Sequence, residues 1–307
     1  MKIIGRTLAR NTILNIIGQV MPLFVAVLTL PFIVRGLGAD RFGLISLAWV
    51  VLGYFAIFDI GLGRATTKFV ADALGKGEEK EVPILVWTSV TIQAIMGIIG
   101  GSVLAAVTPL LVNHLLNIQP ELIGEAQITF YILAFSVPVI LITGSFSGVL
   151  EAAQRFDLVN AIRIATSSLT YFLPLVGIFL GYTLPGIVVL ILLGRLGALA
   201  AYILLDLRLY PELNKYVISS DRFRPLFYFG GWVMVTSIIS PILVYLDRFL
   251  IGSIMSMAAV AYYSAPYEAV THLRFIPSSM MMTLFPAFSS LNAVDDDRKL
   301  STLFTRA

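Results

Sequence analysis

The chain carries ionisable residues inside segments that are otherwise apolar. Those whose type and depth suit binding or transport are Arg35, Asp59, Arg64, Arg195, Asp247, Arg248, Glu268, His272 and Arg274. A charged side chain at the centre of a bilayer costs about 2.5 to 3.5 kcal/mol on insertion scales, so it usually pairs with another group or lines a pathway. The pattern therefore predicts a polar route through a membrane protein.

Composition places these residues in a membrane. The 307 residues are 58% hydrophobic and only 13% charged, and their mean hydropathy is +0.91. A soluble domain has a charged fraction near a quarter. The net charge of +3 is too small to argue for nucleic acid as a partner, and the absence of cysteine excludes disulfides, cysteine-ligated zinc and thiol catalysis.

We expect an all-α, polytopic helix bundle of about eight spans, because a bilayer core requires about twenty apolar residues per helix. The predicted spans are Thr12–Val34, Phe42–Gly63, Pro83–Val112, Ala126–Leu150, Ile164–Leu180, Leu184–Leu205, Leu226–Leu246 and Ala259–Leu284. Glycines and a proline in Gly181–Gly186 mark the turn between the fifth and sixth spans. The basic N-terminal residues precede a long apolar run without a small-residue cleavage site, so we interpret this run as a retained span.

Lysine and arginine are distributed unevenly between alternate loops. One set comprises Lys2, Arg6, Arg10, Arg64, Lys68, Lys76, Lys80, Arg155, Arg163, Arg208, Lys215, Arg222, Arg224, Arg298, Lys299 and Arg306, and the other only Arg35 and Arg41. Basic loops stay in the cytoplasm, so we expect a cytoplasmic N-terminus. The spans divide into a six-helix lobe at 1–208, a cytoplasmic inter-lobe loop at 209–225 and two helices of an incomplete second lobe at 226–307.

The depth of each charge follows from a rise of 1.5 Å per helical residue. Arg195 and Glu268 lie about ten residues into their spans, roughly 15 Å deep and near the midplane. Glu268 and His272 share one helix face, which we expect to line a cavity, while Arg274 lies in the inner half of the same span on another face. The other candidates lie nearer the surfaces: Asp59 and Arg64 toward the cytoplasm, and Arg35, Asp247 and Arg248 toward the outside.

Cations at outer, middle and inner depths suit a polyanionic headgroup. Arginine binds phosphate oxygens bidentately and stays charged when desolvated, so a diphosphate fits this series. Signals for catalysis or for a bound metal are poor by comparison. Asp295–Asp297 lies in a polar segment beside Arg298 and Lys299, and Gly61–Gly63 lacks the third glycine of a dinucleotide loop. We therefore expect neither an enzyme nor a cofactor.

Two motifs carry a family resemblance. The segment Pro31–Gly43, followed by FDIGLGRATTKFVAD, resembles the N-terminal signature of bacterial polysaccharide flippases, which are the O-antigen and exopolysaccharide transporters of the multidrug/oligosaccharidyl-lipid/polysaccharide superfamily. The resemblance implies twelve or more helices and a location in the bacterial inner membrane. It also implies movement of a polyprenyl-diphosphate-linked oligosaccharide to the outer leaflet, by alternating access of two lobes around a cationic cavity. Arg35, Asp59 and Arg64 fall within the matching part.

Several alternatives remain open at this point. A cation-coupled drug exporter of the same superfamily would use Asp59 and Glu268 as ion sites. A membrane-bound enzyme of polysaccharide assembly would need a large outer loop, whereas the longest predicted one, near Asn113–Glu125, is short. A purely structural scaffold would leave the midplane charges unexplained. The expected partners of a flippase are its lipid-linked oligosaccharide, membrane lipids and other proteins of polysaccharide assembly.

Overall fold

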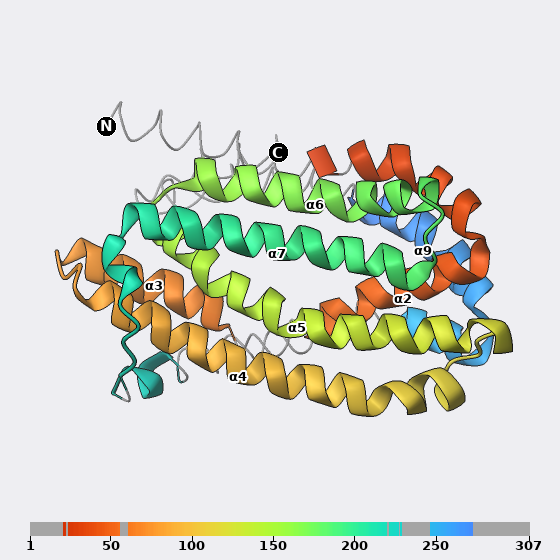
Figure 1. Cartoon of the computed structure of the whole chain (residues 1–307), viewed down its shortest axis with the longest axis horizontal. Coiled ribbons are helices and arrows are strands. Elements are labelled where there is room, and N and C mark those ends of the chain that lie inside the picture. The colour runs from red at the N-terminus through yellow and green to blue at the C-terminus, as the bar shows by residue number, and fades with distance from the viewer. Residues whose placement is uncertain are drawn as a thin grey trace, which may run out of the picture.

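The computed structural model is helical throughout the part of the chain that it describes. This part comprises residues 21–22, 24–55, 61–219, 221–226, 228 and 246–272, without the side chains of 51–55, 269 and 272. It contains no strand, and its long helices run side by side along one axis (Figure 1). The prediction of an all-α polytopic bundle is confirmed.

The helices follow one another with short connections. After the apolar helix Phe24–Leu37 come α2 (Ala39–Phe55), α3 (Leu62–Gly75), α4 (Glu81–Leu110), a π-helical turn (Leu111–Leu115), a 3-10 turn (Pro120–Leu122), α5 (Ile123–Ala152), α6 (Phe156–Phe179), α7 (Leu184–Leu209), the 3-10 turn η4 (Pro211–Asn214), a helix at 246–254 and α9 (Met257–His272). Within the described residues, four segments are long and apolar enough to cross a membrane: Glu81–Leu115, Pro120–Ala152, Phe156–Phe179 and Leu184–Leu209. They coincide with the third to sixth predicted spans.

The second predicted span differs from the structure. It was expected to end at Gly63, but α3 continues from Leu62 to Gly75 after a left-handed Gly61 with φ of 65°. This helix is amphipathic: Leu62, Ala65 and Val70 are buried, and the charged residues Arg64 and Lys68 between them are exposed. A search for charge-free runs cannot detect such a helix, because its charged face interrupts every run. Arg64 therefore lies about 17 Å along the helix axis from the end of α3 at Gly75, and its depth in the membrane stays a prediction.

The turns gather at two ends of the bundle. One end, here called the basic end, holds the connections 75–81 and 152–156 and the segment 209–215 (Figure 1). The opposite end holds the turns at 37–39, 111–123, 179–184 and 254–257, including glycines with positive φ at Gly38 and Gly181. The turn predicted at Gly181–Gly186 is confirmed. Among the described residues, Lys76, Lys80 and Arg155 of the predicted basic set lie at the basic end, and Arg35 and Arg41 lie at the opposite end. The membrane side of each end stays a prediction.

Small and polar residues join α3, α4 and α5. A buried chain of hydrogen bonds runs from Thr66 to Ser89 (2.5 Å), from Ser89 to Ser145 (2.8 Å) and from the Ser145 hydroxyl to the Gln93 side-chain oxygen (2.5 Å). In lipid, such bonds and close backbone contact replace the hydrophobic effect between helices. They fix the start of α3, and with it Arg64, against the rest of the bundle.

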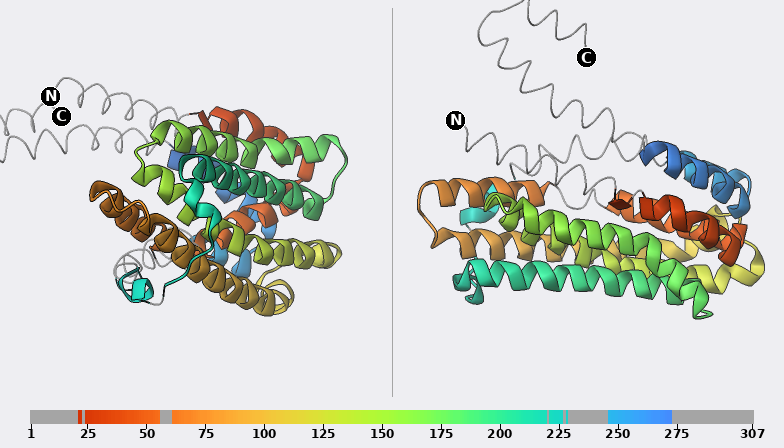
Figure 2. Two further views of the ribbon diagram at one scale, coloured as in Figure 1. Left: turned by 60° about the vertical axis from the view of Figure 1, so that its left-hand side comes forward. Right: turned by 90° about the horizontal axis from the view of Figure 1, so that it is seen from above.

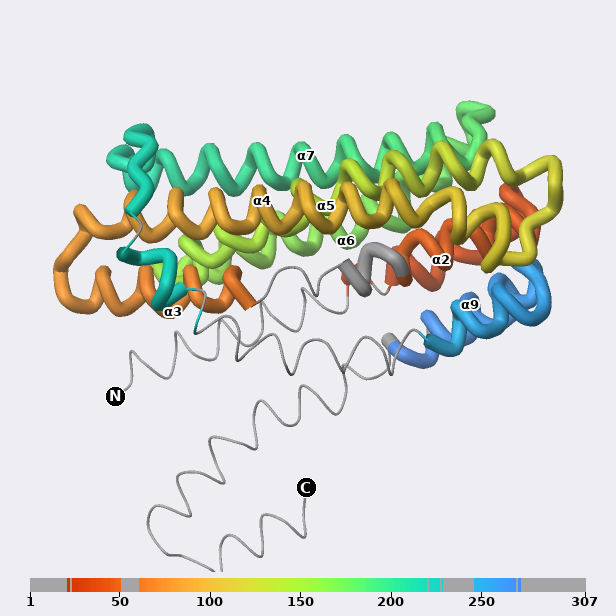
Figure 3. The backbone as a smooth tube through the Cα atoms, turned by 90° about the horizontal axis from the view of Figure 1, so that it is seen from below, coloured from red at the N-terminus to blue at the C-terminus, as the bar shows by residue number. Residues whose placement is uncertain are grey.

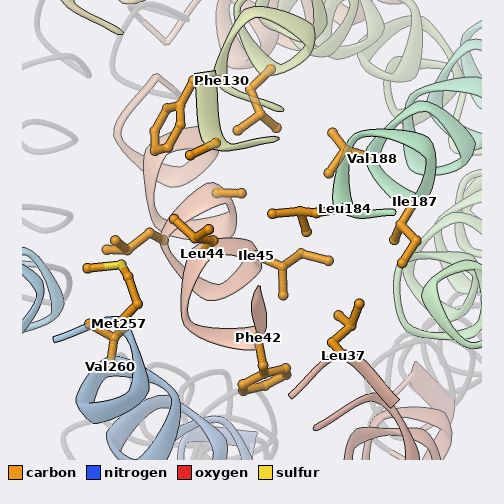
Figure 4. Close-up of a cluster of buried hydrophobic side chains, with 14 of the residues drawn as sticks. Leu37, Phe42, Leu44, Ile45, Phe130, Leu184, Ile187, Val188, Met257 and Val260 are labelled. Carbon is orange, nitrogen blue, oxygen red and sulfur yellow. The ribbon is translucent and has the colours of Figure 1, made fainter. Parts of the chain in front are cut away.

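An apolar core connects the first helices with the last one at the opposite end. Leu44 and Ile45 of α2 lie between Phe130 of α5, the α7 residues around Leu184, and Met257 of α9 (Figure 4). The views from the side and from above both show α9 beside α2 (Figure 2). The core therefore spans elements separated by more than two hundred residues.

Close packing of α4 against α5 gives a stability prediction. A Cβ atom at Gly97 would lie 2.5 Å from Cα of Pro138, whereas a Cβ at Gly124 would meet nothing within 4 Å. We expect Gly97→Leu to destabilise the protein by about 1 to 3 kcal/mol, as overpacking does. Gly124→Leu is the control. Thermal unfolding in detergent measures both, and equal melting temperatures for the two variants would contradict this packing.

Candidate functional site

Arg195 lies near the middle of α7 and lines a small cavity between α2, α5 and α7. The lining residues are Ile45, Ala48, Trp49, Leu133, Ser136, Val188, Ile191, Leu192 and Arg195, and the cavity has a volume of about 10 Å³. This volume is close to that of one water molecule. The sequence predicts that Arg195 lies near the membrane midplane, and this depth stays a prediction.

Two nitrogen donors at this cavity have no acceptor. The Nε atom of Arg195 and the Nε1 atom of Trp49 are both buried without a hydrogen-bond partner. No carboxylate lies within ion-pair distance of Arg195 in the described part of the chain. Ser136 donates its hydroxyl proton to the Ile132 carbonyl (3.0 Å), so its oxygen can still accept a hydrogen bond. Buried donors normally have partners, so this site is suited to an incoming acceptor oxygen.

A second cationic feature lies on α3. Arg64 and Lys68 are four residues apart, both are exposed, and both lie on the face opposite the buried Ala65 and Val70. The ammonium group of Lys68 lies 5.4 Å from the centre of the Phe69 ring. Residues one turn apart on a helix lie about 5 to 6 Å apart at their Cβ atoms, so both side chains can reach the same anionic group. The sequence identified Arg64 but not the contribution of Lys68, which had been counted only as a loop residue.

Charges in the last two helices neutralise one another. The Nη2 atom of Arg248 donates to Glu268 at 3.1 Å, and the guanidinium lies 4.7 Å from the Tyr267 ring centre. Only 1% of the Arg248 side chain is exposed. Asp247 accepts hydrogen bonds from the Tyr263 hydroxyl and from the Arg248 main-chain amide. Asp247 and Arg248 are adjacent on one helix and cannot pair with each other through their side chains. Each of them has a partner on α9 instead.

The remaining predicted residues lie apart from these groups or outside the described residues. Arg35 is exposed in the last turn of the helix Phe24–Leu37, at the opposite end. Asp59, Arg274 and the side chain of His272 lie outside the described residues, so the predicted face shared by Glu268 and His272 stays a prediction.

Trp49 and Tyr263 were not identified from the sequence. Both lie in runs of apolar residues, where an aromatic side chain usually belongs to the core. The ring of Trp49 packs edge-on against Tyr171, with ring centres 5.5 Å apart, and Trp49 also lines the cavity. The sequence offered one indication for Trp49, which is its position four residues after Ile45 and therefore on the same helix face.

The basic end also has an open depression of about 580 Å³. It is lined by Gly77, Glu78, Glu79, Lys80, Glu81, Glu212 and Arg222. Four glutamates surround two cations there, and Arg222 already pairs with Glu81 at 2.7 Å. A polyanion would be repelled by this surface, so the depression is not part of the cationic series.

Contacts at the opposite end join the turn after 246–254 to the first helices. The Asn117 side chain donates to the Met255 carbonyl (2.7 Å), and its main-chain amide donates to the Gly252 carbonyl (3.0 Å). Any Cβ at Gly43 would overlap the main-chain oxygen of Met257, so α2 and α9 touch backbone to backbone. The opposite end is therefore closed between α2 and α9.

Comparison with known proteins agrees with these features. The profile of the family described as "Polysaccharide biosynthesis protein" matches residues 8–292. The chain is 30% identical over 288 residues to the "Putative O-antigen transporter" of Shigella flexneri, covering 93% of this chain and 67% of that protein. It is 20% identical over 298 residues to the "Uncharacterized membrane protein EpsK" of Bacillus subtilis strain 168, covering 95% of this chain and 58% of EpsK.

Solved structures show the same fold. An inward-facing multidrug resistance MATE family transporter of the MOP superfamily superposes with a TM-score of 0.76 at 16% identity, over 94% of this chain and 69% of that one. The outward-facing structure of a MATE family transporter gives a TM-score of 0.61 at 15% identity, over 93% and 71% of the two chains. With the family profile covering most of its length, the chain belongs to the polysaccharide biosynthesis protein family.

Proposed function

We propose that this chain moves a lipid-linked oligosaccharide across a bacterial inner membrane. The substrate class is a polyprenyl-diphosphate carrying an O-antigen or exopolysaccharide repeat unit, and the direction is from the basic, cytoplasmic side to the outer leaflet. The name of the Shigella flexneri relative supports this class. The chain spans about two thirds of that relative's length.

Arg195 is the observation that carries the proposal. It is a midplane guanidinium without a carboxylate in the described structure, beside a second unpartnered donor on Trp49. By contrast, Arg248 is neutralised by Glu268. A cation held in this way at mid-depth is available for an anionic group that passes it. Arg64 and Lys68 on α3 and Arg35 at the opposite end supply further cations along the route.

Removing these cations should stop transport without preventing folding. We expect Arg195→Gln and Arg64→Gln to reduce translocation of a fluorescent polyprenyl-diphosphate oligosaccharide in proteoliposomes at least about tenfold, because each loses a charge-assisted bond to phosphate. Arg195→Lys should retain part of the rate, since it keeps the charge but loses the planar fork. Arg208→Gln, an exposed residue of the basic end, is the control. Wild-type rates in both glutamine variants would overturn the proposed route.

Alternating access requires that the closed end open during the cycle. The closure depends on Asn117 and on the α2–α9 contact at Gly43, which join the first helices to the second lobe. No ion pair between described residues crosses this contact, so separation exposes apolar surface and breaks the two Asn117 hydrogen bonds. We propose that this conformation is closed to the outside.

Locking the closure should stop transport. The chain has no cysteine, so Asn117→Cys and Met255→Cys can be joined by a short bifunctional thiosulfonate reagent. We expect the linked pair to lose translocation and to regain it after reduction. The control pair, Gln119→Cys with Asp40→Cys, lies at the same end and replaces a 3.0 Å hydrogen bond within the first lobe. Full activity of the linked Asn117–Met255 pair would rule out this gate.

A cation-coupled exporter is the alternative, and the fold alone is compatible with it. That function requires carboxylates able to release and bind a cation. Glu268 is already bound to Arg248 at 3.1 Å, which leaves it poorly suited to the task. Asp59 lies outside the described residues.

The role of Glu268 can be tested through stability. Glu268→Gln removes the carboxylate that lies 3.1 Å from the buried Arg248 guanidinium, and breaking a buried pair costs about 3 to 5 kcal/mol. The double variant Arg248→Met with Glu268→Leu removes both charges and should recover most of that loss. Thermal unfolding separates the variants. An unchanged melting temperature in Glu268→Gln, together with lost dependence of transport on an ion gradient, would instead favour the exporter.

A further inference from the structure

A strap, residues 211–219, crosses α4 after the end of α7 (Figure 3). Three hydrogen bonds hold it: the Trp87 indole donates to the Leu213 carbonyl (2.9 Å), the Tyr216 and Thr91 hydroxyls share a bond (3.0 Å), and the Ser219 amide donates to Thr88 (3.2 Å). All three partners lie within two turns of α4. The inter-lobe connection is thus attached to the first lobe at a defined level near the basic end.

Apolar side chains of the strap are exposed on the surface. Tyr216 is 62% exposed, Val217 40% and Ile218 47%. The Tyr216 ring makes an edge-to-face contact with Trp87, with ring centres 4.9 Å apart. Three consecutive large apolar residues on a protein surface form a patch that water solvates poorly.

The backbone of the same residues requires water. Residues 215–218 have no regular secondary structure, and no backbone hydrogen bond from Tyr216, Val217 or Ile218 occurs within the described part of the chain. Unpaired amides and carbonyls are not tolerated against lipid tails. The apolar side chains therefore argue against a location in open water, and the backbone argues against a location in the hydrocarbon core. The headgroup layer satisfies both, because it supplies water and apolar depth together.

Charge and aromatic content agree with that layer. Lys215, Arg222 and Arg224 are exposed around the strap, and Arg222 already contacts Glu81. Lys215 and Arg224 therefore remain for lipid phosphates. Tyr216 and Trp87 are of the residue types that concentrate at membrane interfaces.

We propose that the strap is an interfacial anchor, whose apolar side chains enter the headgroup layer at the basic end while Lys215 and Arg224 bind phospholipid phosphates. The anchor fixes the depth of the inter-lobe connection while the two lobes move. This inference concerns the lipid that surrounds the protein and not the transported substrate, so it can fail or hold independently of the proposed function.

Site-directed spin labelling of the cysteine-free chain tests the depth. Ile218→Cys is compared with Glu78→Cys in the exposed loop before α4 and with Ile98→Cys on the exposed middle of α4, in liposomes of phosphatidylethanolamine and phosphatidylglycerol. The ratio of oxygen to nickel-complex collisions should rank the Ile218 label between the other two, at least about twofold above the Glu78 label. A ratio equal to that of Glu78 would place the strap in water, and one equal to that of Ile98 would place it in the hydrocarbon core. Either result overturns the proposal.

A second measurement tests the phosphate contacts. Lys215→Gln with Arg224→Gln should lower the collision ratio of the Ile218 label, since the strap then lifts toward water. The matched control is Lys76→Gln with Lys80→Gln, which removes the same charge from the α3–α4 connection at the same end. An equal change in both double variants, or no change in either, would show that Lys215 and Arg224 do not hold the strap to headgroups.

Discussion

The structure depends on one constraint, which is that every polar group placed in lipid needs a partner. Backbone groups meet it within helices, and this is why the described part of the chain is helical throughout its spans. Side chains meet it in pairs or networks, such as the buried chain from Thr66 through Ser89 and Ser145 to Gln93. Exceptions to the rule are therefore informative, and Arg195 and Trp49 are two of them.

The charged residues of the last two helices and those of the first lobe have different surroundings. Arg248 and Glu268 satisfy each other, so the last two helices present a neutral, closed surface to α2. In the first lobe, Arg195 has no such partner, and Arg64 with Lys68 forms an exposed cationic face. The exposed cations on α3, together with Arg195, which has no carboxylate within ion-pair distance among the described residues, are suited to attract an anion into the first lobe.

Close contact between helices also limits where the bundle can move. Gly43 allows α2 and α9 to touch through their backbones, and Gly97 does the same for α4 against Pro138 of α5. The second contact lies within the first lobe, beside the polar chain, and makes that lobe a firm unit. The first contact joins elements distant in sequence without an ion pair across it among the described residues, so it is the more readily reversible of the two.

The sequence by itself determined the all-α membrane class and the third to sixth spans, and it predicts that basic loops share one side and that Arg195 lies at mid-depth. These follow from the length of apolar runs and from charge counts, which are local properties. Only the tertiary structure decided that α3 continues to Gly75, that Arg248 pairs with Glu268 and that Trp49 meets Arg195. Each of these depends on which helices are neighbours in space. The local sequence around a charged residue is the same whether or not a residue of another helix pairs with it.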